Sequence, residues 1–178
     1  MTDPRIELIS SYIVDVADFP SPGVVFKDIT PLLGCNEAYQ ACVEALVDLA
    51  PGDVDVVVGI EARGFVFAAP VALALGVGFV PVRKPGKLPR DVYSQSFDLE
   101  YGKDTLAIHQ DAIHKGARVM IIDDVLATGG TVSATTKLID RLGAEVVEIG
   151  IVLELGFLGG RAHLSSQGIN NIHALITT

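Results

Sequence analysis

Residues Val119–Thr131, VMIIDDVLATGGT, join an apolar run to two adjacent aspartates and a loop of small residues. The apolar run predicts a buried strand over Arg118–Asp123, and the pattern after the loop predicts a helix from about Thr131 to Leu142, ending at Gly143. Ligands of open parallel sheets bind beyond the carboxyl ends of the strands, where Asp123 and Asp124 are expected to fall. This stretch therefore predicts an α/β fold with a ligand site at its centre.

Three more short β-branched runs predict further strands, at Val54–Ile60, Gly78–Arg83 and Ala144–Leu153. A helical pattern over Phe65–Leu75 lies between the first two. Two strand–helix–strand units in series predict a central, mostly parallel twisted sheet with helices on both faces. The final strand-like piece, Ile172–Ile176, is interpreted as structural.

The length of 178 residues predicts a single domain, 1–178, with local additions. Helical patterns at Arg5–Val14 and Glu37–Leu49 flank the Pro- and Gly-rich segment Phe19–Leu33. We expect residues 1–35 to form a helix and an irregular N-terminal hood over one end of the sheet. The stretch of about 84–102 is rich in Pro, Gly, Ser and charge, and long connections of this kind are often flexible lids.

The composition excludes one broad class of function. Thirteen Lys and Arg against 22 Asp and Glu give a net charge of −9, whereas a general nucleic-acid binder needs a basic field. Cys35 and Cys42 form neither a disulfide framework nor a zinc motif, which favours a reducing compartment. No secretory signal pattern and no apolar window of about 20 residues occurs. We expect a soluble, cytoplasmic protein with no nucleic-acid or membrane partner.

The small-residue loop has the features of a phosphate site. Glycines let backbone amides approach an anion closely, threonines add hydroxyl donors, and the start of a helix supplies unpaired N–H groups. The candidate phosphate-binding residues are Ala127, Thr128, Gly129, Gly130 and Thr131. Because carboxylates repel phosphate, Asp123 and Asp124 must serve sugar hydroxyls or the waters of a bound Mg²⁺. The alternative is a capped helix start with solvated aspartates.

A cluster of cations in this acidic chain predicts an anion site. Its members lie between positions 63 and 90: Arg63, Arg83, Lys84, Lys87 and Arg90. Arg63 lies between a predicted strand end and a helix start, where its guanidinium and nearby amides can converge on a pyrophosphate. The alternative is a solvated charge run, which applies most to Arg90.

The run Val119–Thr131 resembles the 5-phosphoribosyl-1-pyrophosphate (PRPP) motif of the type I phosphoribosyltransferases, which identifies only the superfamily. Further blocks resemble the adenine phosphoribosyltransferase family: GVVFKDITPLL (Gly23–Leu33), GIEARGFVFAAPVA (Gly59–Ala72), VRKPGKLP (Val82–Pro89) and LEYGKDTLAIHQDAI (Leu99–Ile113). The resemblance covers about Phe19–Leu155, and its FKDIT and LEYG blocks point to adenine. It implies conversion of adenine and PRPP to AMP and pyrophosphate in purine salvage, by a homodimer that uses Mg²⁺.

The resemblance also implies roles for single residues. Phe26 would stack on adenine while main-chain atoms of Val25 and Lys27 bind its edge, and Leu155 or Phe157 would form a wall of the base pocket. Glu100 would act as general acid/base. PRPP would be held by Arg63, Arg83, Lys87, Asp123, Asp124 and residues 127–131, with Mg²⁺ bound mainly by PRPP and water rather than by side chains.

The family usually has a cis peptide in the loop that carries Arg63, so we expect one at Glu61–Ala62. Two alternative functions stay open. One is a sister purine transferase for hypoxanthine, guanine or xanthine, which the residues around Phe26 disfavour. The other is a non-catalytic regulator that senses PRPP.

Overall fold

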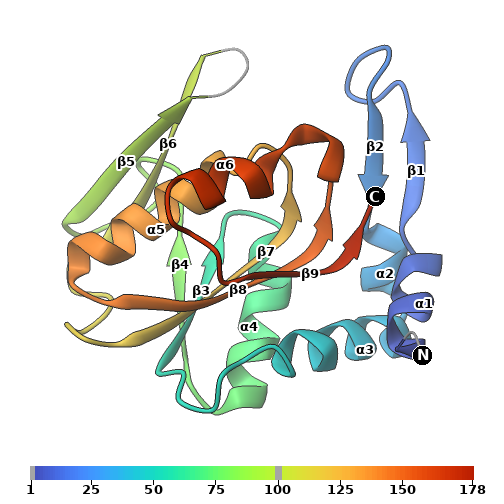
Figure 1. Cartoon of the computed structure of the whole chain (residues 1–178). Helices are drawn as coiled ribbons and strands as arrows, with labels where there is room; N and C mark the ends of the chain where they lie inside the picture. The colour runs from blue at the N-terminus through green and yellow to red at the C-terminus, as the bar shows by residue number, and fades with distance from the viewer. Residues whose placement is uncertain (1–2, 99–101) are drawn as a thin grey trace. The chain divides into compact units, whose positions relative to one another are not determined.

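The computed structural model describes residues 3–98 and 102–178 (Figure 1). The chain divides into two compact units, Met1–Ala45 and Leu46–Thr178. The expectation of one domain with an N-terminal hood and a flexible lid stays a prediction. No helix within the described ranges has the length and apolar character needed to cross a membrane.

The second unit is built on a five-stranded sheet whose neighbouring strands are all parallel. Across the sheet the strands are β4 (Gly78–Val82), β3 (Val56–Ile60), β7 (Arg118–Leu126), β8 (Glu145–Glu154) and β9 (Ile172–Thr177). Long buried runs in β7 and β8 explain the apolar sequences there, because a parallel sheet is covered on both faces. The predicted α/β class and the predicted strands are confirmed to within a few residues at their ends.

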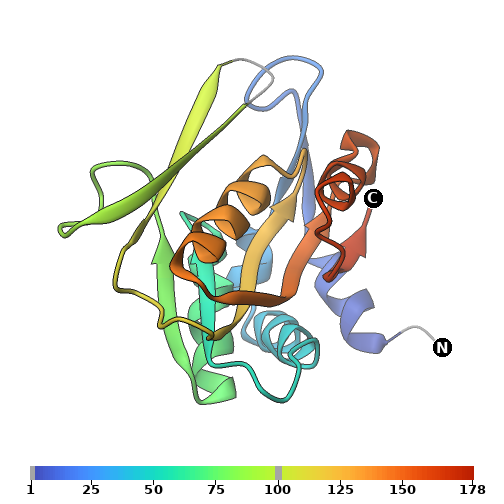
Figure 2. The ribbon, with the colours of Figure 1, turned by 60° about the vertical axis from the view of Figure 1, so that its left-hand side comes forward.

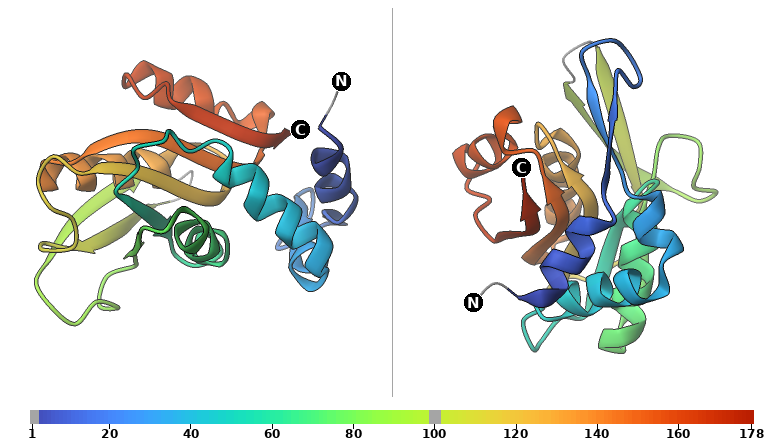
Figure 3. Two further views of the ribbon diagram at one scale, coloured as in Figure 1. Left: turned by 90° about the horizontal axis from the view of Figure 1, so that it is seen from below. Right: turned by 90° about the vertical axis from the view of Figure 1, so that its right-hand side faces the viewer.

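The connecting helices cover both faces of this sheet. From β3 the chain passes through α4 (Gly64–Leu75) to β4 on one side, and from β7 it passes through α5 (Gly130–Leu142) and α6 (Gly160–Ser166) toward β9 on the other. Right-handed crossovers in opposite directions put α4 on one face and the other two helices on the opposite face. Figure 2 shows α5 in front of β7, and the left view of Figure 3 shows α4 and α6 on opposite sides of the sheet.

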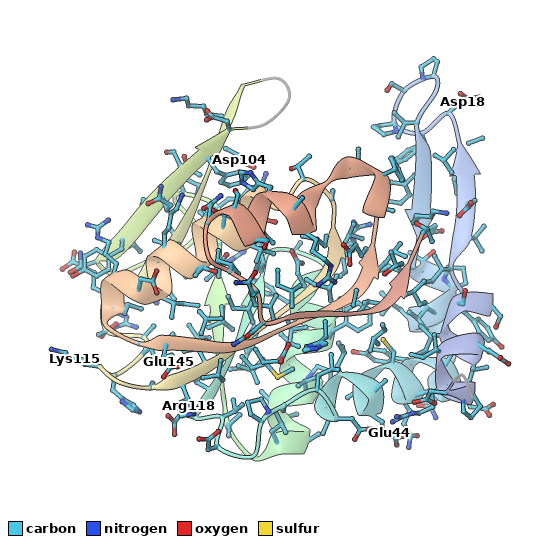
Figure 4. All side chains as sticks on the ribbon, viewed as in Figure 1. Asp18, Glu44, Asp104, Lys115, Arg118 and Glu145 are labelled. Carbon is cyan, nitrogen blue, oxygen red and sulfur yellow. The ribbon has the colours of Figure 1, made fainter. Side chains whose placement is uncertain are left out.

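The strand order therefore reverses between β3 and β7, which is where α/β sheets bind ligands. The amino ends of the strands carry a separate group of charges. There Arg118 pairs with Asp53 and Glu145, at 2.8 and 3.4 Å. Figure 4 shows Arg118 and Glu145 close together at this end of β7 and β8.

The prediction that β7 ends at Asp123 was wrong. The strand continues to Leu126, because β8 is ten residues long and still offers Leu153 and Glu154 as partners for Val125 and Leu126. Asp123 and Asp124 thus lie inside a strand and not in the loop after it.

The segment 84–102 also holds structure that the sequence did not indicate. It contains β5 (Val92–Asp98), which pairs antiparallel with β6 (Lys103–His109). The polar residues of β5 give no clear alternation of apolar and polar side chains, so the sequence does not predict a strand there. In β6, the buried Leu106 and Ile108 pack in the core. A pair of backbone hydrogen bonds between Arg83 and Ala107, of 2.9 and 2.7 Å, joins β6 to the residue after β4.

The first unit contains more regular structure than we expected. Helix α1 (Pro4–Ser11) ends before Val14, because Val14–Ala17 forms β1 and pairs antiparallel with β2 (Val25–Asp28). The segment Phe19–Leu33, predicted to be irregular, thus contains β2 and part of α2 (Thr30–Gly34). Helix α3 (Asn36–Val47) begins in the first unit and ends in the second, because the boundary falls between Ala45 and Leu46.

Candidate active site

A pocket of about 450 Å³ lies at the carboxyl ends of β3 and β7, where the strand order reverses. Its described lining comes from three places in the sequence: the end of β3 and the loop after it, the end of β7 and the loop after it, and β5. The lining residues are Ile60, Glu61, Ala62, Arg63, Phe97, Asp123, Asp124, Val125, Ala127, Thr128, Gly129, Gly130 and Thr131. The predicted acidic pair, the predicted phosphate loop and Arg63 thus meet in one cavity.

The phosphate loop connects β7 to the start of α5. Gly129 has φ 86°, which places it in the left-handed region that favours glycine. Gly130 is also tightly enclosed, since a Cβ there would lie 2.7 Å from Cδ2 of Phe97. The first turn of α5 leaves N–H groups without helical acceptors, and its residues Gly130 and Thr131 line the pocket together with Thr128. The geometry suits a doubly charged phosphate.

Asp123 and Asp124 are buried, with 7% and 5% of their surfaces exposed. Asp123 Oδ1 accepts a hydrogen bond from the Asp124 N–H at 2.9 Å, and Arg63 Nε lies 2.8 Å from Asp124 Oδ2. Gly64 permits this packing, because a Cβ there would come within 2.8 Å of Asp123 Oδ1.

The burial of these two carboxyls changes their acidity. Burial raises the pKa of Asp123 well above its ordinary value, and the neighbouring charge of Asp124 raises it further. Burial also raises the pKa of Asp124, while the Arg63 guanidinium opposes that shift. Acceptor groups of this kind suit hydroxyl donors, such as the two vicinal hydroxyls of a ribose.

The loop after β3 is held by one carboxylate. Glu61 Oε2 and Oε1 accept hydrogen bonds from Arg83 Nε at 3.1 Å and Nη2 at 3.2 Å, and Oε2 also accepts one from the Lys84 N–H at 2.9 Å. The side-chain bond from Arg83 is the main cause that lowers the pKa of Glu61. The Glu61–Ala62 peptide is cis, which confirms the expectation from the resemblance.

The cations predicted to bind pyrophosphate are placed differently from one another. Arg63 lines the pocket, whereas Arg83 and Lys87 are not among its described lining residues. Arg83 is bound to Glu61 and also donates to the Lys87 carbonyl at 3.2 Å, and Lys84 pairs with Asp104 at 3.1 Å. Roles for Arg83 and Lys87 on PRPP stay predictions.

Phe97 is a lining residue that the sequence analysis missed. It lies on β5 and packs against the start of α5 through the bare Cα of Gly130. A single phenylalanine after the polar run Ser94–Ser96 was the only local signal, and the contact joins residues 33 positions apart.

The predicted base-binding residues Val25, Phe26 and Lys27 lie on β2 in the first unit. Phe26 packs edge-on against Phe19, with ring centroids 5.1 Å apart, and Lys27 Nζ lies 2.7 Å from Asp15 Oδ1. Their contact with a base stays a prediction.

Leu155 and Phe157, the predicted wall of the base pocket, are not among the described lining residues. Leu155 follows β8 and donates its N–H to the Leu126 carbonyl at 2.9 Å, while Phe157 is 77% exposed. Glu100 lies outside the described residues. Within residues 3–98 and 102–178, no three His, Cys, Asp or Glu side chains gather closely enough to hold a metal ion.

Comparisons with known proteins agree with this geometry. The family model described as "Phosphoribosyl transferase domain" matches residues 30–161. The adenine phosphoribosyltransferase of Cutibacterium acnes is 61% identical over 97% of this chain and 98% of its own length. That of Yersinia pseudotuberculosis is 54% identical over 95% of this chain and 91% of its own length.

Two solved structures extend the likeness to three dimensions. The adenine phosphoribosyltransferase of Thermoanaerobacter pseudethanolicus superposes with a TM-score of 0.92, at 48% identity over 97% of this chain and 99% of the other. That of Saccharomyces cerevisiae, a complex with an imino-altritol bisphosphate and adenine, gives a TM-score of 0.90 at 36% identity, covering 97% and 98%.

Proposed function

The chain belongs to the adenine phosphoribosyltransferases, and on that premise we propose how its residues convert adenine and PRPP into AMP and pyrophosphate. In this purine-salvage reaction a ring nitrogen of adenine bonds to the anomeric carbon of ribose. The bond from that carbon to pyrophosphate breaks, with inversion and an oxocarbenium-like transition state. The observation that carries the residue assignment is the meeting of the acidic pair, the phosphate loop and Arg63 in one pocket.

The loop Ala127–Thr131 is proposed to hold the 5′-phosphate of PRPP. Backbone amides at the start of α5 and the hydroxyls of Thr128 and Thr131 would donate to its oxygens. This phosphate is remote from the reacting carbon, so its binding energy serves to align that carbon for attack.

Asp123 and Asp124 are proposed to accept hydrogen bonds from the ribose hydroxyls. Arg63 lies beside Asp124, 41% exposed at its side chain, and can extend toward the pyrophosphate leaving group. Negative charge builds on that group in the transition state, so a fixed cation lowers the barrier. Arg83 and Lys87 would add further charge from the neighbouring loop, and Arg83 already fixes the loop through Glu61.

Magnesium is proposed as the cofactor. The pocket carboxylates of Asp123 and Asp124 could accept hydrogen bonds from the waters of an ion held mainly by PRPP. When bound, Mg²⁺ would neutralise charge on the departing pyrophosphate.

Adenine is proposed to stack on Phe26, with main-chain groups of Val25 and Lys27 along its edge and Leu155 as a further apolar contact. A backbone N–H can donate a hydrogen bond to the unprotonated ring nitrogen beside the exocyclic amine of adenine. In hypoxanthine the corresponding nitrogen carries a proton, so two donors would face each other.

Glu100 would take the proton from the attacking nitrogen, directly or through water.

By resemblance, the active form is proposed to be a homodimer.

A product assay tests this proposal. Purified protein with Mg²⁺, PRPP and adenine should give AMP and pyrophosphate in equal amounts, resolved by ion-exchange chromatography. A reaction without Mg²⁺, in EDTA, should be nearly silent. If PRPP binds but no AMP forms, the enzymatic assignment is wrong and the PRPP sensor takes its place.

A further inference from the structure

The glycine-rich segment Gly156–Gly160 has no role in the reaction described so far. The structure shows its last residue in contact with the phosphate loop. A Cβ on Gly160 would lie 2.2 Å from the Ala127 carbonyl oxygen and 3.1 Å from the Gly129 nitrogen. In the other direction, a Cβ on Gly129 would lie 3.0 Å from the Gly160 carbonyl oxygen. The two backbones therefore touch at a place where neither can carry a side chain.

One turn further along α6, Leu164 closes the same contact. Its side chain is fully buried, and its Cγ would lie 3.0 Å from a Cβ on Gly129. Leu164 also belongs to the hydrophobic core together with Leu126 and Val132, which flank the loop on β7 and α5. The loop is consequently packed between its own flanking elements and α6, which lies next to it in Figure 1.

An ion pair fixes α6 to the sheet. Arg161 Nε donates to both oxygens of Glu154, at 3.0 and 3.1 Å, and its Nη2 donates to Oε2 at 2.6 Å. Its Nη1 donates to the Ile172 carbonyl at 2.8 Å. Glu154 is 5% exposed and ends β8, so this fork joins α6 to the carboxyl end of β8 and to the first residue of β9. Bidentate pairs of this kind restrict orientation as well as distance.

A second connection runs from α6 to α5. Ser133, in the first turn of α5, donates its Oγ to Gln167 Oε1 at 2.7 Å, and Gln167 Nε2 lies 2.8 Å from His163 Nε2. Helix α6 therefore packs against the phosphate loop and is itself bonded to β8, β9 and α5.

We propose that Gly160 is a positioning residue for the 5′-phosphate. By allowing α6 to contact the Ala127–Gly129 backbone, Gly160 keeps the amides at the start of α5 directed into the pocket, without touching the substrate. The inference rests on the proposed function for the identity of the ligand. It assigns the phosphate affinity of the site partly to a helix some 30 residues further along the chain than the loop.

The test compares two alanine variants in the same segment. Gly160→Ala introduces the close contact, whereas Gly156→Ala is the matched control, because its Cβ would lie at an ordinary 3.4 Å from Thr177 Cγ2. Calorimetry with ribose 5-phosphate should show affinity reduced by about tenfold or more in Gly160→Ala, as for the loss of one charge-assisted hydrogen bond, and unchanged in Gly156→Ala. KM for PRPP should rise similarly while KM for adenine stays constant.

A milder variant keeps the test decisive if Gly160→Ala fails to fold. Arg161→Lys keeps the charge but cannot form the fork to Glu154, so it should weaken ribose 5-phosphate binding several-fold, with a native circular-dichroism spectrum. Amide hydrogen exchange of residues 127–133 should also become faster. Unchanged binding and exchange in folded Arg161→Lys would overturn the proposal, as would unchanged binding in folded Gly160→Ala.

These outcomes separate the inference from the reaction on which it rests. Wild-type protein that binds ribose 5-phosphate but does not consume adenine refutes the proposed function, while the variant comparison still decides the role of Gly160. An active wild type whose variants bind ribose 5-phosphate equally well refutes only the positioning role. A wild type that neither binds ribose 5-phosphate nor forms AMP refutes both.

Discussion

Asp123 and Asp124 are adjacent, buried acids, and Arg63 forms an ion pair with Asp124. Burial and like charge both raise the pKa of Asp123, so the folded state favours its neutral form. The contribution of such a group to folding is fully present below the unfolded-state carboxyl pKa, near 3.9, and is lost as pH rises through the folded-state pKa. At neutral pH, where the unfolded-state carboxyl is ionised, the burial of Asp123 therefore opposes folding.

Asp123→Asn should stabilise the protein and weaken its function. We expect Tm at pH 7 to rise by about 2–4 °C, the shift for about 1 kcal/mol in a chain of this size. KM for PRPP should rise by about tenfold, because a ribose hydroxyl loses one of the two carboxyl oxygens that would accept its hydrogen bond. Thermal unfolding at pH 7 and pH 4 checks the cause, since the stability gain should shrink at the lower pH.

Asp124→Asn provides the contrast for that experiment. Because Arg63 already offsets the charge of Asp124, Asp124→Asn should raise Tm less than Asp123→Asn does. A Tm for Asp123→Asn at or below that of the wild type at pH 7 would contradict the account of this pair.

Glu100→Gln addresses proton transfer alone. If Glu100 is the general base, kcat should fall at least about 100-fold, while calorimetric binding of PRPP stays unchanged. Equal turnover by the variant and the wild type, with PRPP still bound, would assign the proton to another group.

At the scale of elements, the β1–β2 hairpin carries the proposed base contacts. Phe26→Ala should raise KM for adenine by about tenfold, since stacking of a base on an aromatic ring contributes about 1–3 kcal/mol. KM for PRPP should not change. Val24→Ala, directly before β2 and 42% exposed, is the control and should behave as the wild type. A Phe26→Ala enzyme with unaltered KM for adenine would remove Phe26 from the base site.

Elements with strong apolar periods were predictable from the sequence, and those with polar surfaces were not. The runs in β3, β7 and β8 indicated the sheet because both of its faces are buried. The hairpin β1–β2 and strand β5 are mostly exposed or half-exposed, so their residues carry no comparable pattern. The end of β7 was misplaced because Asp123 and Asp124 are polar residues inside a buried strand.

At the scale of the whole molecule, some pocket residues could be predicted from local sequence patterns, and others are revealed only by contacts in the folded chain. Local sequence sufficed to expect the phosphate loop, the acidic pair and Arg63 near one another. The loop and Arg63 lie between a strand and a helix, and the acidic pair lies near the end of β7. Phe97 and Gly160 could not be found in this way. Phe97 contacts Gly130, and Gly160 contacts Ala127 and Gly129, so these contacts join distant parts of the chain.

The association state is a property of the whole molecule. If the protein is a homodimer, light scattering after gel filtration should give twice the chain mass of 18.8 kDa across a range of concentrations. A mass of 18.8 kDa together with full activity would show that one chain suffices for the reaction.

The central claim is that this molecule joins ribose 5-phosphate specifically to adenine. The most direct measurement is pyrophosphate release from PRPP and Mg²⁺ with adenine, hypoxanthine, guanine or no base. We predict turnover with adenine and kcat/KM values for the two oxopurines lower by about 10⁴-fold, because each would leave buried donors opposed. Comparable turnover with an oxopurine would contradict the assignment of Phe26 and its neighbours to adenine.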